Sequence, residues 1–298
     1  REARDVVNFL VEEVGVSRDV VGKLICKCPQ LFSLRLSAMR ERAWFLIDEV
    51  GIPSERLGGL ITRHPHLLRF SVKRRLRPTL EFLICEVGIP PQHGGVGKVV
   101  LNHPGILHLS VERKLRQGWE WLMLEIGLSK EEAARVIQGY PGVLALKMEP
   151  TVRRKLEYLA SIGLNPQEIK RVIVHEPLSL SRSLDSMIDL VNFFTTEASV
   201  PPAQVPSVLV ACPALTAYST LRLSESTTFL RVSMGMSREQ VSSTVVCFPR
   251  ILTYKTESNL KLKVDYLEEK GFLLSEIRDE VVLRPSVLAY SLKNRVVP

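Results

Sequence analysis

Apolar residues recur at helical spacing along almost the whole chain, in shorter and longer stretches that alternate. A shorter stretch has Ile169 and Val172 three positions apart, and a longer one has Leu76, Leu80 and Leu83 at steps of four and three. Both spacings place the apolar side chains on one face of an α-helix. The pattern therefore predicts an all-α protein, and its apolar stretches are too short to predict a membrane span.

A proline ends each shorter stretch, and the prolines are evenly spaced. Five of the seven intervals between them are 36 residues, and the other two are 39 and 37. The eight prolines are Pro29, Pro65, Pro104, Pro141, Pro177, Pro213, Pro249 and Pro285. Such a period indicates a repeated supersecondary unit that stacks on its neighbours into a solenoid.

A glycine ends each longer stretch, with Ser199 in the sixth place. These glycines are Gly15, Gly51, Gly88, Gly127, Gly163, Gly235 and Gly271. Glycine suits the left-handed conformation that closes a helix. After it, three pairs have the spacing of a capping box that starts the next helix: Ser129 with Glu132, Asn165 with Glu168, and Ser237 with Gln240.

Each repeat is thus predicted to contain two α-helices and a short link. The proline disfavours helix at the residue before it, and the apolar pair after it predicts a turn or a short 3₁₀ helix. We expect one helical-repeat solenoid of about eight repeats over residues 1–298, as a single domain.

Composition adds a basic bias and excludes several kinds of site. Lys and Arg number 40 against 32 Asp and Glu, a net charge of +8, which suits a polyanionic partner. Five cysteines make no even disulfide set and no paired metal half-sites, and we expect them to be buried apolar residues in a reducing compartment. The histidines near the prolines lack a recurring partner, and no catalytic or phosphate-loop motif occurs. We therefore expect no metal, no cofactor and no enzymatic activity.

The ends of the second helices carry a family resemblance. The segments WFLIDEVG, EFLICEVG, EYLASIG and DYLEEKG, together with the glycine, proline and apolar pair, resemble the repeats of the mitochondrial transcription termination factor family, mTERF. The resemblance covers nearly the whole chain. It implies a curved half-doughnut of helical repeats, targeting to an organelle, and nucleic-acid binding along a positively charged concave groove.

Basic residues recur at one place on the second helix of the repeat. Positions 14, 11 and 10 before each glycine lie on one helical face, opposite the apolar positions. That face and its flanks carry the candidate phosphate-binding residues Arg40, Arg74, Arg75, Arg77, Arg113, Lys114, Arg116, Arg153, Arg154 and Lys261. Arg182, Arg222 and Lys263 are further candidates in the later repeats, where Asp185, Asp189, Glu225 and Glu257 interrupt the basic face.

Aromatic residues five positions after the proline have two interpretations. Phe70, Tyr218, Tyr254 and Tyr290 could stack on unpaired bases, but leucine takes the same position in other repeats, which favours core packing.

These features lead to one functional hypothesis and two alternatives. The first is an organellar protein, mitochondrial or else chloroplast, that binds double-stranded DNA as a monomer and terminates or blocks transcription. The second is an RNA-binding factor in organellar RNA maturation or ribosome assembly. The third is a scaffold that binds other proteins.

Overall fold

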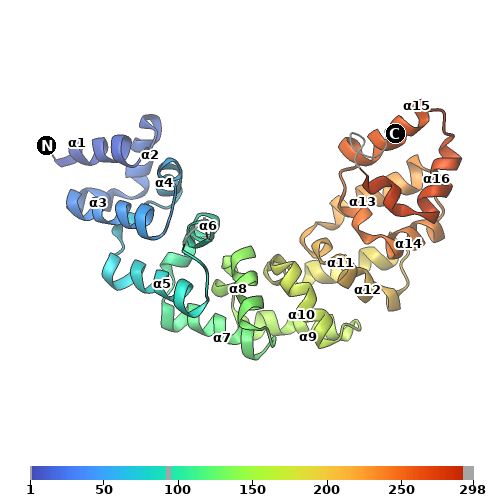
Figure 1. The fold of residues 1–298 in the computed structure, drawn as a ribbon, viewed down its shortest axis with the longest axis horizontal. Helices are drawn as coiled ribbons and strands as arrows, with labels where there is room; N and C mark the ends of the chain where they lie inside the picture. Colours follow the sequence, from blue (N-terminus) through green and yellow to red (C-terminus); the bar gives the residue numbers. More distant parts are fainter. Residues whose placement is uncertain (1, 92–94, 291–298) are drawn as a thin grey trace. The chain divides into compact units, whose positions relative to one another are not determined.

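The structure is a computed structural model that describes residues 2–91 and 95–290, and these residues form helices and turns without a strand (Figure 1). Contacts divide the chain into two compact units, residues 1–146 and 147–298. The division falls inside the fourth repeat, after its 3₁₀ helix, so each unit contains four of the repeat prolines. The all-α repeat architecture predicted from the sequence is confirmed.

Within the described residues, each unit contains eight α-helices. The first unit has α1 (Glu2–Asn8), α2 (Arg18–Lys27), α3 (Leu36–Trp44), α4 (Ser54–Arg63), α5 (Arg77–Glu81), α6 (Gly95–Asn102), α7 (Arg116–Leu124) and α8 (Lys130–Gly139). The second has α9 (Arg153–Ser161), α10 (Pro166–His175), α11 (Leu184–Thr196), α12 (Val205–Ala211), α13 (Thr220–Thr228), α14 (Arg238–Cys247), α15 (Leu262–Glu269) and α16 (Leu274–Leu283).

A short 3₁₀ helix begins at every repeat proline, as the sequence predicts. These helices are η2 (Pro29–Ser33), η4 (Pro65–Arg69), η7 (Pro104–His108), η9 (Pro141–Ala145), η11 (Pro177–Ser181), η13 (Pro213–Ala217), η15 (Pro249–Thr253) and η17 (Pro285–Ala289). An additional short one, η12 (Pro202–Gln204), precedes α12. Proline suits this first position because its fixed φ is already helical and its missing N–H is not needed there.

The second helix of the repeat is less regular than the sequence predicts, because it includes π-helical turns. These turns are η1 (Phe9–Glu13), η3 (Phe45–Glu49), η5 (Val72–Leu76), η6 (Phe82–Glu86), η8 (Val111–Leu115), η10 (Met148–Val152), η14 (Phe229–Ser233) and η16 (Thr256–Lys261). In the π-helical turns next to the glycines, backbone hydrogen bonds span five residues, such as the bond from Val50 N–H to the Phe45 carbonyl at 3.1 Å.

The predicted left-handed helix ends are present at all eight positions. The seven repeat glycines have positive φ, and so does Ser199, at 55°. The chain then closes back on the helix, as where Ile52 N–H donates to the Leu46 carbonyl at 3.0 Å. This six-residue closure is the Schellman motif, and it satisfies a carbonyl that the helix end would otherwise leave open.

The three predicted capping boxes also form. The side chains of Ser129, Asn165 and Ser237 each accept a hydrogen bond from the backbone N–H three residues later, and each returning Glu or Gln side chain accepts one from the cap residue. The first helix of these repeats therefore begins where the sequence places it.

The core of each unit runs along its stack of repeats. First helices pack on first helices, as α2 on α4 and α12 on α14, and the 3₁₀ helices pack on one another, as η7 on η9 and η13 on η15. The apolar side chains after each proline fill the space between them, and Leu31, Leu67 and Ile106 have no exposed surface. Within the described residues, no helix is both long enough and apolar enough to cross a bilayer.

Candidate nucleic-acid interface

The second helices of repeats two and three begin with equivalent capped turns. Ser71 Oγ accepts a hydrogen bond from Arg74 N–H at 3.2 Å, and Ser110 Oγ accepts one from Arg113 N–H at 3.4 Å. Both arginine side chains are exposed and make no ion pair with another described residue. A helix N-terminus carries positive partial charge, so these two guanidinium groups lie where anions are favoured.

Other predicted arginines of the first unit are held by carboxylates of the preceding repeat. Arg77 contacts Glu49 at 2.6 Å, and Arg40 Nε donates to Glu13 Oε2 at 2.8 Å. Arg116 bonds to Glu86 in the same way and also contacts Glu112 at 3.1 Å. We call these three links, Glu13–Arg40, Glu49–Arg77 and Glu86–Arg116, the inter-repeat ion pairs.

The inter-repeat ion pairs reduce the free positive charge of the predicted basic face. The hydrogen bond that Glu13 accepts from Arg40 lowers the pKa of Glu13, and the hydrogen bond that Arg77 donates to Glu49 raises the pKa of Arg77. Both partners therefore stay charged at neutral pH and largely cancel each other's field. An incoming phosphate must compete with a carboxylate at each of these arginines.

Four of the predicted cations instead bond to backbone carbonyls near the end of the next 3₁₀ helix. Lys114 donates to the Leu146 carbonyl at 2.9 Å, Arg182 to that of Tyr218 at 3.0 Å, and Arg222 to that of Tyr254 at 2.6 Å. Lys263 donates to the Leu288 carbonyl.

Lys263 is buried, and the loss of solvent lowers its pKa. Its ammonium therefore lies inside the second unit, where it does not reach a phosphate. The sequence offered Lys263 as a candidate contact on another face of the later repeats, and its burial shows that this prediction was wrong. Arg42 and Lys155, which the sequence did not single out, bond to the Phe70 and Leu180 carbonyls in the same manner.

The remaining candidate cations differ in whether another side chain contacts them. Arg75 lies 5.9 Å from the centre of the Phe70 ring, and Arg153 and Lys261 pair with Glu149 and Glu257 of their own helices. Arg154 is exposed and has no partner among the described residues.

Lys73 was not among the predicted residues, yet it lies beside Arg74 in the same turn, exposed and without an ion pair in the described part of the chain. The run of three basic residues from 73 to 75 was the signal that could have identified it. Lys73, Arg74 and Arg113 thus form a set of exposed cations at the starts of second helices in the first unit.

The same helical face in the second unit carries acidic side chains. Asp185, Asp189, Glu225 and Glu257 are all exposed. The basic face predicted from the sequence is therefore a feature of the first unit.

The recurring aromatic residues are mostly packed. Phe70 meets the His108 ring edge-on at 4.9 Å, and Tyr254 lies 6.4 Å from Phe248. Tyr218 packs against the core of the second unit, whereas Tyr290 is 42% exposed. Core packing is thus confirmed for the first three.

The prediction that the cysteines are buried holds for only two of the five. Cys28 and Cys212, one residue before a proline, are buried, whereas Cys26, Cys85 and Cys247 are exposed. The prediction was wrong for Cys26 and Cys247 because one or two residues along a helix rotate the side chain to its outer face, and wrong for Cys85, which lies on the exposed side of η6. All five are free thiols.

Among the described residues, no group of three or more His, Cys, Asp or Glu side chains is placed to hold a metal ion.

Comparison with known proteins gives one result. The family model described as mTERF matches residues 1–161 and again residues 158–298. No curated protein matches the chain significantly. The two family matches together span the repeats described above, and proteins of this family are organellar and are associated with nucleic-acid binding and transcription regulation. The chain therefore belongs to the mTERF family.

Proposed function

We propose that this protein binds double-stranded DNA of an organelle genome, through cations at the starts of the second helices in its first unit, and that it regulates transcription by blocking the polymerase. The observation that carries the proposal is the equivalent placement of Arg74 and Arg113, which are exposed, unpaired within the described residues, and located at capped helix N-termini.

The spacing of such positions suits a regular polyanion. Packed helices lie ~8–10 Å apart, so equivalent first turns of adjacent repeats recur at about that distance. Duplex DNA rises ~3.4 Å per base pair, so one repeat corresponds to roughly three base pairs. A row of repeats can therefore contact a backbone at regular intervals.

The proposed contacts differ in what they contribute. Arg74, Arg113 and Lys73 would neutralise phosphates and set the position of the protein, because backbone contacts carry no sequence information. Arginine can in addition bind guanine through two hydrogen bonds, which lysine cannot do. Arg154 is a further candidate phosphate contact, in the second unit, while Arg40, Arg77 and Arg116 would contribute only where phosphate displaces their carboxylates.

The regulatory mechanism requires no catalysis. A monomer that dissociates slowly from its site would stop an advancing polymerase, as a terminator or a roadblock. Of the two organelles, we propose the mitochondrion, because the family is named for mitochondrial transcription termination factors.

A competition experiment tests the choice of polymer. Fluorescent 20-base-pair DNA would be displaced by unlabelled duplex DNA, duplex RNA and single-stranded RNA of the same sequence. The proposal expects duplex DNA to compete best. If single-stranded RNA competed more strongly by tenfold or more, the protein would instead be an RNA-binding factor.

The same experiment identifies the binding residues. Charge reversal of both Arg74 and Arg113 to Glu should abolish binding of the labelled duplex. Charge reversal of the exposed, unpaired Arg154 should weaken that binding less. Unchanged binding in R74E/R113E would favour a protein-binding scaffold over a nucleic-acid-binding protein. Selection of bound fragments from organelle DNA would then define the site.

A further inference from the structure

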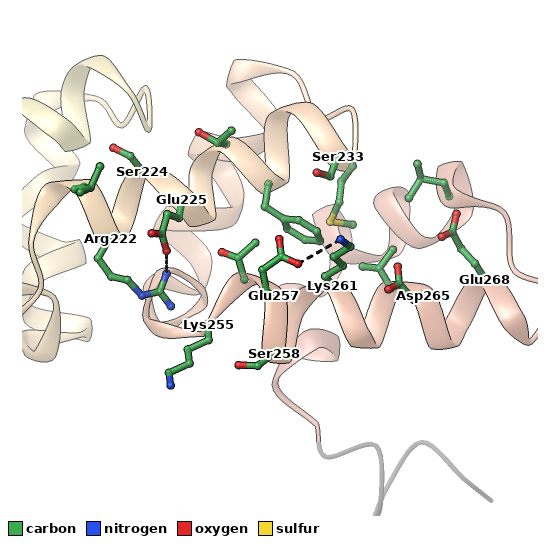
Figure 2. Close-up of a pocket in the computed structure, with 17 residues that line it drawn as sticks. Arg222, Ser224, Glu225, Ser233, Lys255, Glu257, Ser258, Lys261, Asp265 and Glu268 are labelled. Carbon is green, nitrogen blue, oxygen red and sulfur yellow. Dashed lines mark hydrogen bonds and ion pairs between the residues drawn. The ribbon is translucent and has the colours of Figure 1, made fainter.

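The second unit contains an open groove of about 850 Å³ between the second helices of two neighbouring repeats. One wall is α13 with η14, and the other is η16 with α15 (Figure 2). The inter-repeat ion pairs of the first unit have no counterpart here, because Ser233 occupies the place that corresponds to Glu13, Glu49 and Glu86, and Leu260 occupies the place of their arginine partners. Among the described residues, no ion pair therefore links the two walls at this point.

The floor of the groove is apolar and its rim is charged. Phe229, Met234 and Val264 line the floor and are themselves largely buried, whereas Leu221 on the rim is 76% exposed. Thr256 also lines the groove, and its buried hydroxyl has no hydrogen-bond partner among the described residues. The groove thus offers apolar surface and one unsatisfied polar atom to an incoming group.

The charge that remains available on the rim is negative. Glu225 is paired with Arg222 at 2.9 Å and Glu257 with Lys261 at 3.2 Å, as the dashed lines in Figure 2 show.

Asp265 and Glu268 follow on α15, both exposed and without an ion pair in the described part of the chain. Lys255 points away from the other labelled side chains (Figure 2). These two carboxylates repel a phosphate backbone and attract a cationic partner.

The dimensions favour a helix over a small molecule. The wall from residue 221 to residue 234 spans 13 helical steps, or ~20 Å at 1.5 Å per residue. A small molecule needs a pocket that encloses most of its surface, whereas an apolar trough between two helices accepts the apolar face of a third.

We propose that this groove docks an amphipathic helix of a protein partner, with apolar side chains directed at Phe229, Met234 and Val264 and with Lys or Arg side chains meeting Asp265 and Glu268. The site is separate from the proposed nucleic-acid interface in both location and charge. The protein would hold a cationic protein segment with its second unit while its first unit holds a nucleic acid.

Selection from a phage-displayed library of random 16-residue peptides tests this assignment on the full chain. The most enriched peptide, labelled with a fluorophore, is then titrated by anisotropy against the wild type and two groove variants. S233W fills the groove without changing its charge, and D265K/E268K reverses the charge of its rim. D185K/D189K makes the same charge change on α11, away from the groove, and serves as the matched control.

The assignment expects enriched peptides with apolar residues at helical spacing and a cluster of Lys or Arg. Each groove variant should bind the peptide with an affinity at least about tenfold lower than the wild type, and the affinity of the control should change by less than about twofold. Circular dichroism confirms that each variant is folded, and S233W should bind 20-base-pair DNA like the wild type.

Several results would overturn the assignment: no enrichment of any peptide, enrichment of acidic peptides, or equal peptide affinity for the wild type, S233W and D265K/E268K. Failure of DNA binding by the wild type would contradict the proposed function but would leave the outcome of the peptide titration unaffected.

Discussion

Arg113 and Arg116 lie three residues apart on the same helical face, yet the structure predicts different effects when each is replaced. Arg113 is exposed and makes no ion pair with a described residue, whereas Arg116 is held by Glu86 and Glu112. We expect Arg113→Ala to weaken DNA binding and Arg116→Ala chiefly to weaken the fold.

The size of the first effect follows from counterion release. One lost phosphate contact changes the slope of log affinity against log salt by about 0.9. At 0.1 M salt this corresponds to about 0.9 log units, an eightfold loss of affinity or ~1.2 kcal/mol.

For Arg116, one carboxylate contact joins two half-exposed side chains and the other involves the exposed Glu112, and such pairs are worth ~0.2–1 kcal/mol each. R116A should therefore lower the free energy of unfolding by up to about 2 kcal/mol and leave the salt slope unchanged.

The assay is fluorescence anisotropy of a labelled 20-base-pair duplex at four salt concentrations, with urea unfolding of each variant alongside. Equal changes of slope in R113A and R116A would mean that DNA displaces the carboxylates, and the distinction between free and paired arginines would then be refuted.

Three further predictions concern stability. Ser199→Gly should raise the free energy of unfolding by ~0.5–1 kcal/mol, because the free energy gained by removing the side chain from a left-handed residue exceeds the entropy cost of ordering a glycine; a lower thermal midpoint would contradict this. Burial lowers the pKa of His103 and His108, so the unfolded chain binds more protons and stability should fall as pH drops below ~6.5 through their folded pKa values. The variant H103N/H108N should lose less stability between pH 7 and pH 5 in urea titrations, and an identical loss would exclude these histidines as the cause. A double-mutant cycle of E49Q and R77M should give a coupling energy of ~0.2–1 kcal/mol that shrinks at high salt, and a coupling above about 2 kcal/mol would show that the exposed pair matters more than its solvation allows.

The sequence was sufficient for the fold because the relevant signals are local. The left-handed φ of Gly51 or Gly235 depends on the residue itself, and Pro65 or Pro249 ends a helix through its own ring. Because these positions recur at a regular period, the helix boundaries predicted in one repeat supported those predicted in the others. The π-helical turns were missed because they occur at both ends of the second helices, where the apolar spacing does not distinguish a π turn from an α turn.

The sequence was less informative about the site because charge depends on neighbours in other repeats. Glu49 lies 28 residues before Arg77, and only the stacking of repeats brings the two together. Lys263 was a candidate contact in the later repeats, but its long side chain reaches a carbonyl of the next repeat. The groove was likewise invisible, since it depends on the absence of a carboxylate at Ser233.

The most direct test of nucleic-acid binding is the salt dependence of the affinity of the whole chain for duplex DNA. With Lys73, Arg74, Arg113 and Arg154 each neutralising one phosphate, log affinity should fall against log salt with a slope of about −3.6. A slope near zero would contradict the account, because binding would then not involve the phosphate backbone.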